Sequence, residues 1–281
     1  MKKFFAILLS SILMVTTLAA CDNTTDPVGS STQPIESTSS STSQQIIESV
    51  NSESDSEYTP EGSDFTYSNK SMTEIIGLTD QCINNLVLVF PDTVTKISNI
   101  SIPASSKITT VMFLNENVEL ENVNFAGSSI TTILNLPTSI TSISDNMFYG
   151  CTELTTLGNK NGEIIIPNHI TNIKPGAFGG CSKITTVDAS NVTEISDRAF
   201  EGCKNLKNFT FDNITSIGNL SFYMCGFETL AFPDTLNSIG ENAFTLNNNL
   251  TTVNISDNTK VNKSAFDKCE KLTSNIKFTE S

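Results

Sequence analysis

The chain has 281 residues, of which 30 are acidic and 16 are basic, so its net charge is −14 at pH 7 with the histidine neutral. Nucleic-acid binding depends largely on Lys and Arg contacts with phosphates, so an acidic chain without a basic stripe is a poor nucleic-acid binder. The sequence has no Trp, which weakens a role in sugar stacking, and His169 is its only imidazole for activating a Ser or Cys nucleophile.

The N-terminal segment 1–20 has the pattern of a secretory signal peptide. Two lysines precede an apolar run over residues 4–15, which is shorter than the roughly 20 residues that a membrane-spanning helix needs. The segment Leu18-Ala-Ala-Cys21 resembles a bacterial lipobox, in which the cysteine receives a diacylglycerol and becomes the first residue of the mature protein. We therefore expect residues 1–20 to be a lipoprotein signal peptide and Cys21 to be lipidated. An ordinary signal peptide with an incidental cysteine is the alternative.

Residues 21–64 are predicted to form a disordered, acidic, Ser- and Thr-rich tether that begins at the lipidated Cys21. Positions 22–64 hold nine acidic residues, no Lys or Arg and almost no large apolar residues. Such a segment cannot bury enough apolar surface to offset the entropy lost on ordering. A flexible coil of this length spans about 35 to 40 Å. Because the chain is acidic and repels anionic lipid, we expect it to contact the membrane only through the lipid.

Five phenylalanines recur at every twenty-second position, and the segments around them align position by position. They are Phe178, Phe200, Phe222, Phe244 and Phe266. The residue before each one is small, the residue five positions earlier is Ile or Val, and Cys or Asn follows three positions later. A fixed period of this size indicates stacked repeats, each of which can bury its apolar face only against its neighbours.

A coil of this length has room for two short extended segments and a tight turn, but not for a pair of helices. Runs such as 206–211 and 250–255 alternate apolar and polar residues, which predicts strands. The Ala-Phe-x-Gly-Cys segments predict short helical turns that end at Gly. The register continues upstream to Phe148, whose spacing of 30 residues from Phe178 places eight additional residues around 158–163. Insertions of this kind form loops on one face of a solenoid.

These patterns predict a mostly β repeat solenoid with short parallel strands and short helical turns, in about eight coils of about 22 residues. We place it at residues 65–281, with irregular coils to about residue 140 and regular coils over 140–281.

The repeat unit resembles that of a known family. Pro-x-x-Ile-Thr-x-Ile followed by Ala-Phe-x-Gly-Cys-x-x-Leu-Thr is similar to the BspA-type leucine-rich repeat, which belongs to bacterial and protist surface proteins. The resemblance implies a surface protein, since members are mostly adhesins or surface antigens that bind host matrix proteins or other cells. The first coils, Asn247 and the final coil at 272–276 depart from the family pattern.

Five of the seven cysteines share one repeat position: Cys151, Cys181, Cys203, Cys225 and Cys269. Asn247 occupies the same position in the remaining coil. Leucine-rich repeats place Asn or Cys there because the side chain satisfies backbone groups in the turn, so we expect a column of buried, reduced thiols. Disulfides between adjacent coils are an alternative, because stacking brings the cysteines close. A metal site is least favoured, since the chain has no C-x-x-C motif and one His.

The outward positions of the predicted strands are the candidate binding site. They are Thr186, Asp188, Asn208, Thr210, Thr229, Thr252 and Asn254, with Ala231 among them. This array of small polar side chains on a parallel sheet predicts a flat surface for a protein or glycan, unless these residues are merely solvated strand formers. Only one of the eight is acidic, so the face lacks the carboxylate pair that glycosidases use. We expect no catalytic residue, metal or cofactor.

The sequence thus predicts a bacterial cell-surface lipoprotein, anchored to the cytoplasmic or the outer membrane and facing outward. Its solenoid would bind a host matrix or cell-surface protein or glycan, and not nucleic acid. A non-adhesive surface antigen or structural surface protein is the alternative. A polysaccharide-degrading solenoid enzyme is a remote one.

Overall fold

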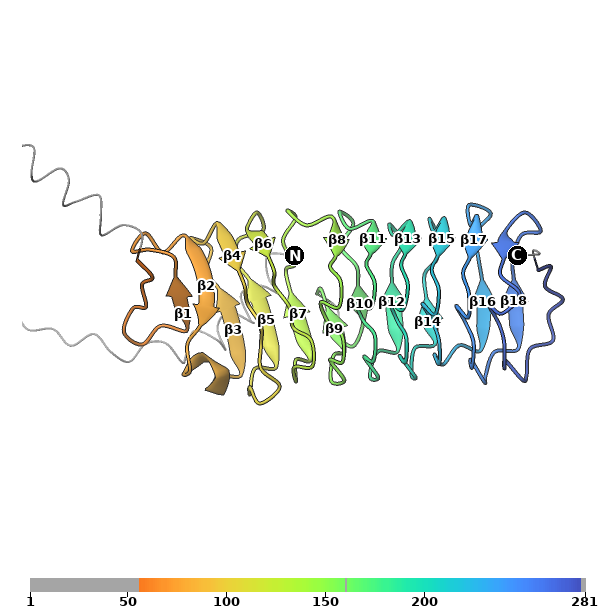
Figure 1. Ribbon diagram of the computed structural model, residues 1–281, viewed down its shortest axis with the longest axis horizontal. Coiled ribbons are helices and arrows are strands. Elements are labelled where there is room, and N and C mark those ends of the chain that lie inside the picture. Colours follow the sequence, from red (N-terminus) through yellow and green to blue (C-terminus); the bar gives the residue numbers. More distant parts are fainter. Residues whose placement is uncertain (1–55, 160, 279–281) are drawn as a thin grey trace, which may run out of the picture. The chain divides into compact units, whose positions relative to one another are not determined.

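The computed structural model describes residues 56–159 and 161–278. The predicted signal peptide, Cys21 and most of the predicted tether lie outside these ranges. The described residues form a β-solenoid of about eight coils with a repeat of about 22 residues and almost no helix (Figure 1). The predicted fold class is therefore confirmed.

Most coils contribute one strand to a main sheet. Its seven-stranded part has the order β14-β12-β10-β9-β7-β5-β3, and β16 and β18 form a separate pair. The strands are β3 (Val87–Phe90), β5 (Thr110–Phe113), β7 (Thr132–Leu134), β9 (Thr156–Leu157), β10 (Ile164–Ile165), β12 (Thr186–Asp188), β14 (Asn208–Phe209), β16 (Thr229–Ala231) and β18 (Thr252–Asn254). All pairs in this sheet are parallel.

The other strand of each coil joins a second sheet, which is divided into a four-stranded part, β1-β2-β4-β6, and a six-stranded part, β19-β17-β15-β13-β11-β8. The strands are β1 (Phe65–Tyr67), β2 (Glu74–Leu78), β4 (Lys96–Ser98), β6 (Glu119–Glu121), β8 (Ser142–Ile143), β11 (Asn172–Ile173), β13 (Glu194–Ile195), β15 (Ser216–Ile217), β17 (Ser238–Ile239) and β19 (Lys260–Val261). Only β1 and β2 pair antiparallel. The one helical element of the described ranges is the 3-10 turn η1 (Cys82–Asn84).

The phenylalanines that recur at one repeat position form a continuous column of stacked rings through the core. Seven rings stack from coil to coil, with centroids 5.1 to 5.7 Å apart and planes within 20° of parallel. They belong to Phe125, Phe148, Phe178, Phe200, Phe222, Phe244 and Phe266. Each aromatic pair adds about 0.5–1.5 kcal/mol beyond its area burial. One residue type at one repeat position thus ties each coil to the next.

The Ala-Phe-x-Gly-Cys segments are turns rather than helices, and each contains a left-handed residue two positions after the Phe. Glycine fills this position in the earlier coils, at Gly180 and Gly202 for example, with φ of 74° and 73°. The later coils place Met224, Leu246 and Lys268 there, with φ of 56°, 62° and 58°. A side chain in this region is strained by contact between its Cβ and the following carbonyl oxygen. The turn geometry is therefore kept even where the sequence no longer favours it.

The hydrogen bonding of the solenoid extends upstream of residue 65. Tyr58 pairs with Tyr67 in an antiparallel bridge. Thr79 binds the carbonyl of Asp64 through its N–H at 3.0 Å and the carbonyl of Ser63 through its hydroxyl at 2.7 Å. The end of the predicted tether, from residue 58, is thus hydrogen-bonded to the solenoid.

Candidate functional site

The main sheet brings the predicted binding residues onto one face. In the paired strands β12 and β14, Thr186 lies beside Asn208. In β16 and β18, Thr229 lies beside Thr252, and Ala231 beside Asn254. Successive strand residues point to opposite sides, so the buried residues between them face the core while these face outward. We call the seven predicted residues, Thr186, Asp188, Asn208, Thr210, Thr229, Thr252 and Asn254, the polar face.

The polar face is split between two strand pairs, because β14 and β16 are not joined by a strand ladder. A backbone hydrogen bond from Gly226 N–H to the Leu206 carbonyl (3.0 Å) connects them. An ion pair between Lys207 Nζ and Glu228 Oε1 (3.1 Å) adds a second link. Thr210 follows the end of β14 and is half-buried.

The seven residues differ in how available their side chains are. Asp188 Oδ1 accepts hydrogen bonds from the N–H and the hydroxyl of Ser190, at 3.2 and 2.6 Å, so its carboxylate shapes the turn after β12. Thr229 and Asn254 are exposed, and their side chains make no hydrogen bond with any other described residue. The β16–β18 pair is therefore the most open part of the polar face.

The outward positions form two columns, and upstream the one that leads to Asp188 is apolar, whereas the other keeps Thr110 and Thr132. The apolar column was not part of the predicted site. Val89, Met112 and Leu134 lie in register on β3, β5 and β7, and all are half-buried. Ile165 of β10 lies beside Asp188 of β12, and at this point the column changes from apolar to polar residues. The sequence contains the signal for this apolar column. The Thr-Thr-Val and Thr-Thr-Ile runs at 109–111 and 131–133 align with the later strands, and an apolar residue, Met112 or Leu134, follows each run at the next outward position.

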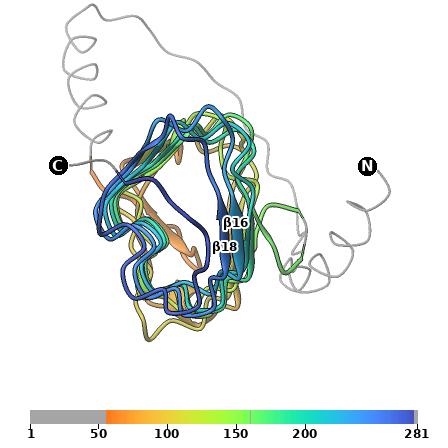
Figure 2. The same cartoon turned by 90° about the vertical axis from the view of Figure 1, so that its right-hand side faces the viewer.

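The insertion forms a loop over residues 158–163, of which all but residue 160 are described, at the point where this outward column changes from apolar to polar. The loop joins β9 to β10, which lie side by side in the main sheet. Figure 2 shows it in green, standing out from the side of the solenoid on which β16 and β18 lie. Gly162 N–H donates to Thr156 Oγ1 at 3.0 Å, so the loop folds over Thr156, which is only 4% exposed. The predicted loop on one face is thus present.

The cysteine column connects consecutive coils through hydrogen bonds. Each Sγ donates to the carbonyl of the Phe in the preceding coil, as Cys181 does to Phe148 (3.1 Å) and Cys203 to Phe178 (3.1 Å). Asn247 Nδ2 makes the equivalent bond to Phe222 at 2.9 Å, which explains why Asn replaces Cys. All six cysteines of the described ranges are buried and free.

These thiols lie outside any reactive environment. Burial raises the pKa of Cys181, Cys203 and Cys225 well above the usual thiol range, and it raises the pKa of Cys82 to about 12. The thiolate is the nucleophile and the metal ligand, so a thiol that stays protonated performs neither role. The column is therefore structural.

The described residues contain no cluster of three or more His, Cys, Asp or Glu side chains that could hold a metal ion. His169 is half-buried, and its Nε2 lies 3.0 Å from the carbonyl oxygen of Pro137 in the neighbouring coil. The imidazole is thus engaged with the backbone. In the part of the chain that the structure covers, no helix is both long and apolar enough to cross a membrane.

Comparison with known families gives one match. Residues 80–188 and 158–273 match the family model described as "BspA type Leucine rich repeat region", in six copies. Together these ranges cover more than half of the chain. No curated protein matches the chain.

Several solved structures are similar at low identity. A leucine rich cell surface protein from Faecalibacterium prausnitzii is 17% identical with a TM-score of 0.41, over 79% of this chain and 88% of that chain. A leucine-rich repeat protein from Bacteroides ovatus is 18% identical with a TM-score of 0.37, over 77% and 79%. A leucine rich repeat protein from T. pallidum is 18% identical with a TM-score of 0.46, over 68% and 90%.

Proposed function

Because the chain belongs to the BspA-type leucine-rich repeat family, we propose that it is a bacterial cell-surface lipoprotein whose polar face binds a protein or glycan partner. The observation that carries this proposal is the exposed array of Thr229, Thr252 and Asn254 on the parallel strands β16 and β18. Short side chains on a flat sheet let a partner approach the backbone closely. They also lose less rotamer entropy on binding than Lys or Arg would.

The partner we propose is a host matrix or cell-surface protein or glycan. The apolar half of the same column, Val89, Met112 and Leu134, supports a partner large enough to reach beyond the polar face. Interfaces commonly combine an apolar part with a polar part that carries hydrogen bonds. We propose no catalytic residue for this face, since Asp188 is its only acidic residue and its carboxylate is engaged by Ser190.

A pair of matched double variants tests the polar face. Thr229→Glu with Thr252→Glu places two acids on adjacent strands of the main sheet. Ser216→Glu with Ser238→Glu does the same on adjacent strands of the second sheet. Both pairs carry the same charge and a similar cross-strand repulsion of up to about 1 kcal/mol.

We expect the main-sheet variant to lose binding to immobilised host matrix proteins and to cell-surface glycans, and the second-sheet variant to keep it. Circular dichroism checks that both variants fold. Equal binding by the two variants, or no binding by the unmodified chain, would argue against an adhesive polar face and in favour of a non-adhesive surface antigen.

The membrane anchor is proposed at Cys21, which lies outside the described residues. The lipobox-like segment 18–21 and the family membership support it. We expect Cys21→Ala, or treatment with globomycin, to release or mislocalise the protein in fractionated cells. Normal anchoring of the variant would contradict lipidation at this residue.

A further inference from the structure

The second sheet is interrupted between β6 and β8, which are the end strands of its two parts. The coils that contain them still pair in the main sheet, through β5 and β7. They also stay bonded on both sides of the interruption. Ser139 Oγ donates to the Val118 carbonyl at 2.6 Å, and Phe125 N–H donates to the Met147 carbonyl at 2.8 Å. The gap is therefore a local opening between consecutive coils, visible in Figure 1 as the wider interval between β6 and β8.

On one side of the gap, β6 has an open backbone edge. Glu119 N–H donates to the Thr95 carbonyl and the Glu121 carbonyl accepts from Asn99 N–H, both at 2.9 Å, so these residues pair toward β4. Backbone groups of successive strand residues point to opposite edges. The N–H and carbonyl of Leu120 therefore point into the gap.

On the other side, β8 has an open edge as well. Lys174 N–H donates to the Ile143 carbonyl at 3.0 Å, so Ile143 pairs toward β11. By the same alternation, the backbone groups of Ser142 and the N–H of Ser144 point into the gap, whereas the Ser144 carbonyl accepts a turn hydrogen bond from Met147 N–H at 3.2 Å. Unpaired strand edges are templates for pairing with another chain, and here two edges face one another across the same opening.

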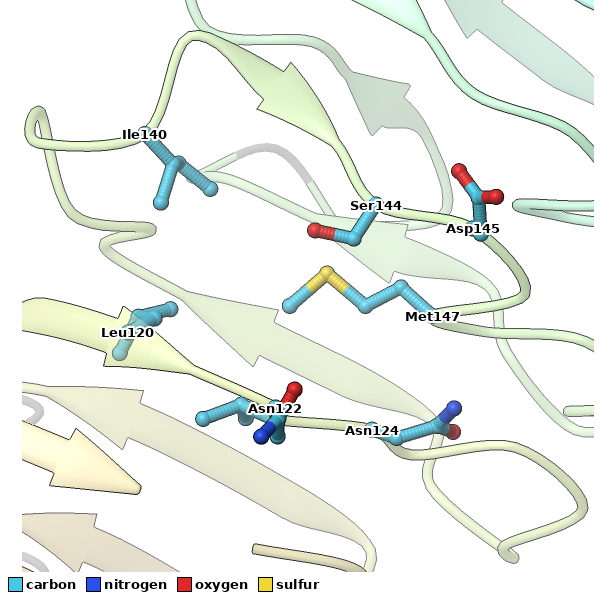
Figure 3. A pocket seen from close by; sticks show the side chains of 8 residues that line it. Leu120, Asn122, Asn124, Ile140, Ser144, Asp145 and Met147 are labelled. Atoms are coloured by element: carbon cyan, nitrogen blue, oxygen red, sulfur yellow. The ribbon is translucent and has the colours of Figure 1, made fainter. Parts of the chain in front are cut away.

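A cavity of about 430 Å³ lies between these edges. This volume is within the range of about 300–1,000 Å³ that ligand sites occupy. Figure 3 shows Leu120 and Asn122 on one side, Ile140 and Ser144 on the other, and Met147 between them. The apolar side chains form the centre of the cavity, and Asn122, Ser144 and Asp145 form its rim.

One acidic residue, Asp145, lines the cavity, and a second, Glu119, directly precedes the lining residue Leu120 in β6. Glu119 and Asp145 are exposed and form no ion pair with other described residues. Lys96, the nearby cation, is already held by Glu121 Oε2 at 2.8 Å and Glu74 Oε1 at 3.3 Å. A ligand with a basic side chain therefore finds a carboxylate partner at this rim.

We propose that this cleft binds an extended peptide segment of a partner protein. The segment would pair its main chain with the open edges of β6 and β8, place an apolar side chain against Leu120, Ile140 and Met147, and set a basic residue beside Glu119 or Asp145. Recognition by strand addition obtains affinity from main-chain hydrogen bonds and specificity from pockets for alternate side chains. The site lies on the second sheet and does not depend on binding by the polar face.

A library of displayed seven-residue random peptides, selected on the full chain, tests the proposal. We expect enriched peptides to share an apolar residue flanked by Lys or Arg. A synthetic copy whose alternate amides are N-methylated should bind at least about tenfold more weakly, because it loses two or more main-chain hydrogen bonds. Hydrogen exchange should slow at residues 119–124 and 140–147 when the unmodified peptide is added.

Two variants, each with a matched control, localise the binding. Ser144→Trp fills the gap, whereas Ser196→Trp changes the same repeat position two coils later, where the second sheet is continuous. Asp145→Lys reverses the charge at the rim, whereas Asp212→Lys reverses an exposed charge elsewhere. We expect at least about tenfold weaker binding for Ser144→Trp and for Asp145→Lys, and unchanged binding for both controls.

Four outcomes would overturn the proposal: no peptide enriched over the Ser144→Trp chain, equal binding of the N-methylated copy, unchanged binding by Asp145→Lys, or glycans bound at this cleft in place of peptides. Because Asp145 is exposed and unpaired within the described residues, its variant stays informative even if Ser144→Trp fails to fold.

Discussion

Asn247 provides a sharp test of how consecutive coils are held together. Its Nδ2 donates to the carbonyls of Phe222 (2.9 Å) and Phe244 (2.7 Å), and its Oδ1 is buried without a partner among the described residues. Phe244 also accepts a bond from the N–H of Asn247 at 3.3 Å. Within the described ranges, the Phe222 carbonyl receives no other hydrogen bond, so this carbonyl depends on the Asn247 side chain.

Asn247→Ala should therefore leave a buried carbonyl without a donor, which costs about 1–3 kcal/mol. Asn247→Cys should supply an Sγ donor to Phe222, as Cys225 does to Phe200 at 3.3 Å, and it also removes the unpaired Oδ1. We expect the Cys variant to be more stable than the Ala variant by about 1–3 kcal/mol.

Cys203→Ala is the matched control, because it makes the same Cys-to-Ala comparison at the same repeat position. The carbonyl of Phe178 loses the Cys203 thiol but keeps the N–H of Cys181 at 3.1 Å. The Cys-to-Ala difference should thus be smaller at 203 than at 247. Urea unfolding at equilibrium measures both differences as shifts of the midpoint at constant slope. Equal differences at the two positions, or an Ala variant as stable as the Cys variant at 247, would refute the reasoning.

Three further predictions test the repeat columns. Ser221→Ala should raise the free energy of unfolding by about 1–2 kcal/mol, because the Ser221 hydroxyl is buried without a partner in the described structure and Ala stands at the same position before Phe178, Phe200, Phe244 and Phe266. A lower free energy of unfolding in urea would contradict this. Leu246→Gly should raise the free energy of unfolding by about 0.5–1 kcal/mol, because Gly adopts the left-handed backbone conformation without the strain that a side chain causes. Gly202→Ala should lower it for the same reason. Midpoint shifts in the same direction for both variants in thermal unfolding would contradict this explanation. Burial raises the pKa of Cys203 in the folded state, so the thiol deprotonates first in the unfolded chain. The contribution of Cys203 to the free energy of unfolding is therefore complete below the unfolded thiol pKa of about 8.5. Above that pH it falls by about 1.4 kcal/mol per pH unit until the folded pKa is reached. Unfolding curves from pH 8 to 10 should therefore fall less steeply for Cys203→Ala than for the unmodified chain, and equal slopes would contradict this assignment.

Much of the fold follows from local periodicity. The five coils from Phe178 to Phe266 place Phe, Ile or Val, a small residue, and Cys or Asn at fixed intervals, and the strands pair one repeat apart, Thr186 with Asn208 and Ser216 with Ser238. A residue that recurs at one repeat position occupies the same environment in each coil. The core, the cysteine column and the outward face could therefore be read from aligned residues. The upstream apolar column follows the same rule, since Met112 and Leu134 stand one position after the inward residues Val111 and Ile133.

Other features depend on how far neighbouring coils separate, which no single coil specifies. Asp188 stands in the predicted face, yet its carboxylate is engaged by Ser190, a contact set by the turn after β12. Leu120 and Ile143 occupy inward-facing strand positions, yet β6 and β8 do not pair while β5 and β7 do. By itself the sequence determined the repeat, its strands and its columns, because these depend on side-chain alternation within a coil. Only the tertiary structure decided where a ladder of hydrogen bonds opens, because pairing depends on the displacement of one coil against the next.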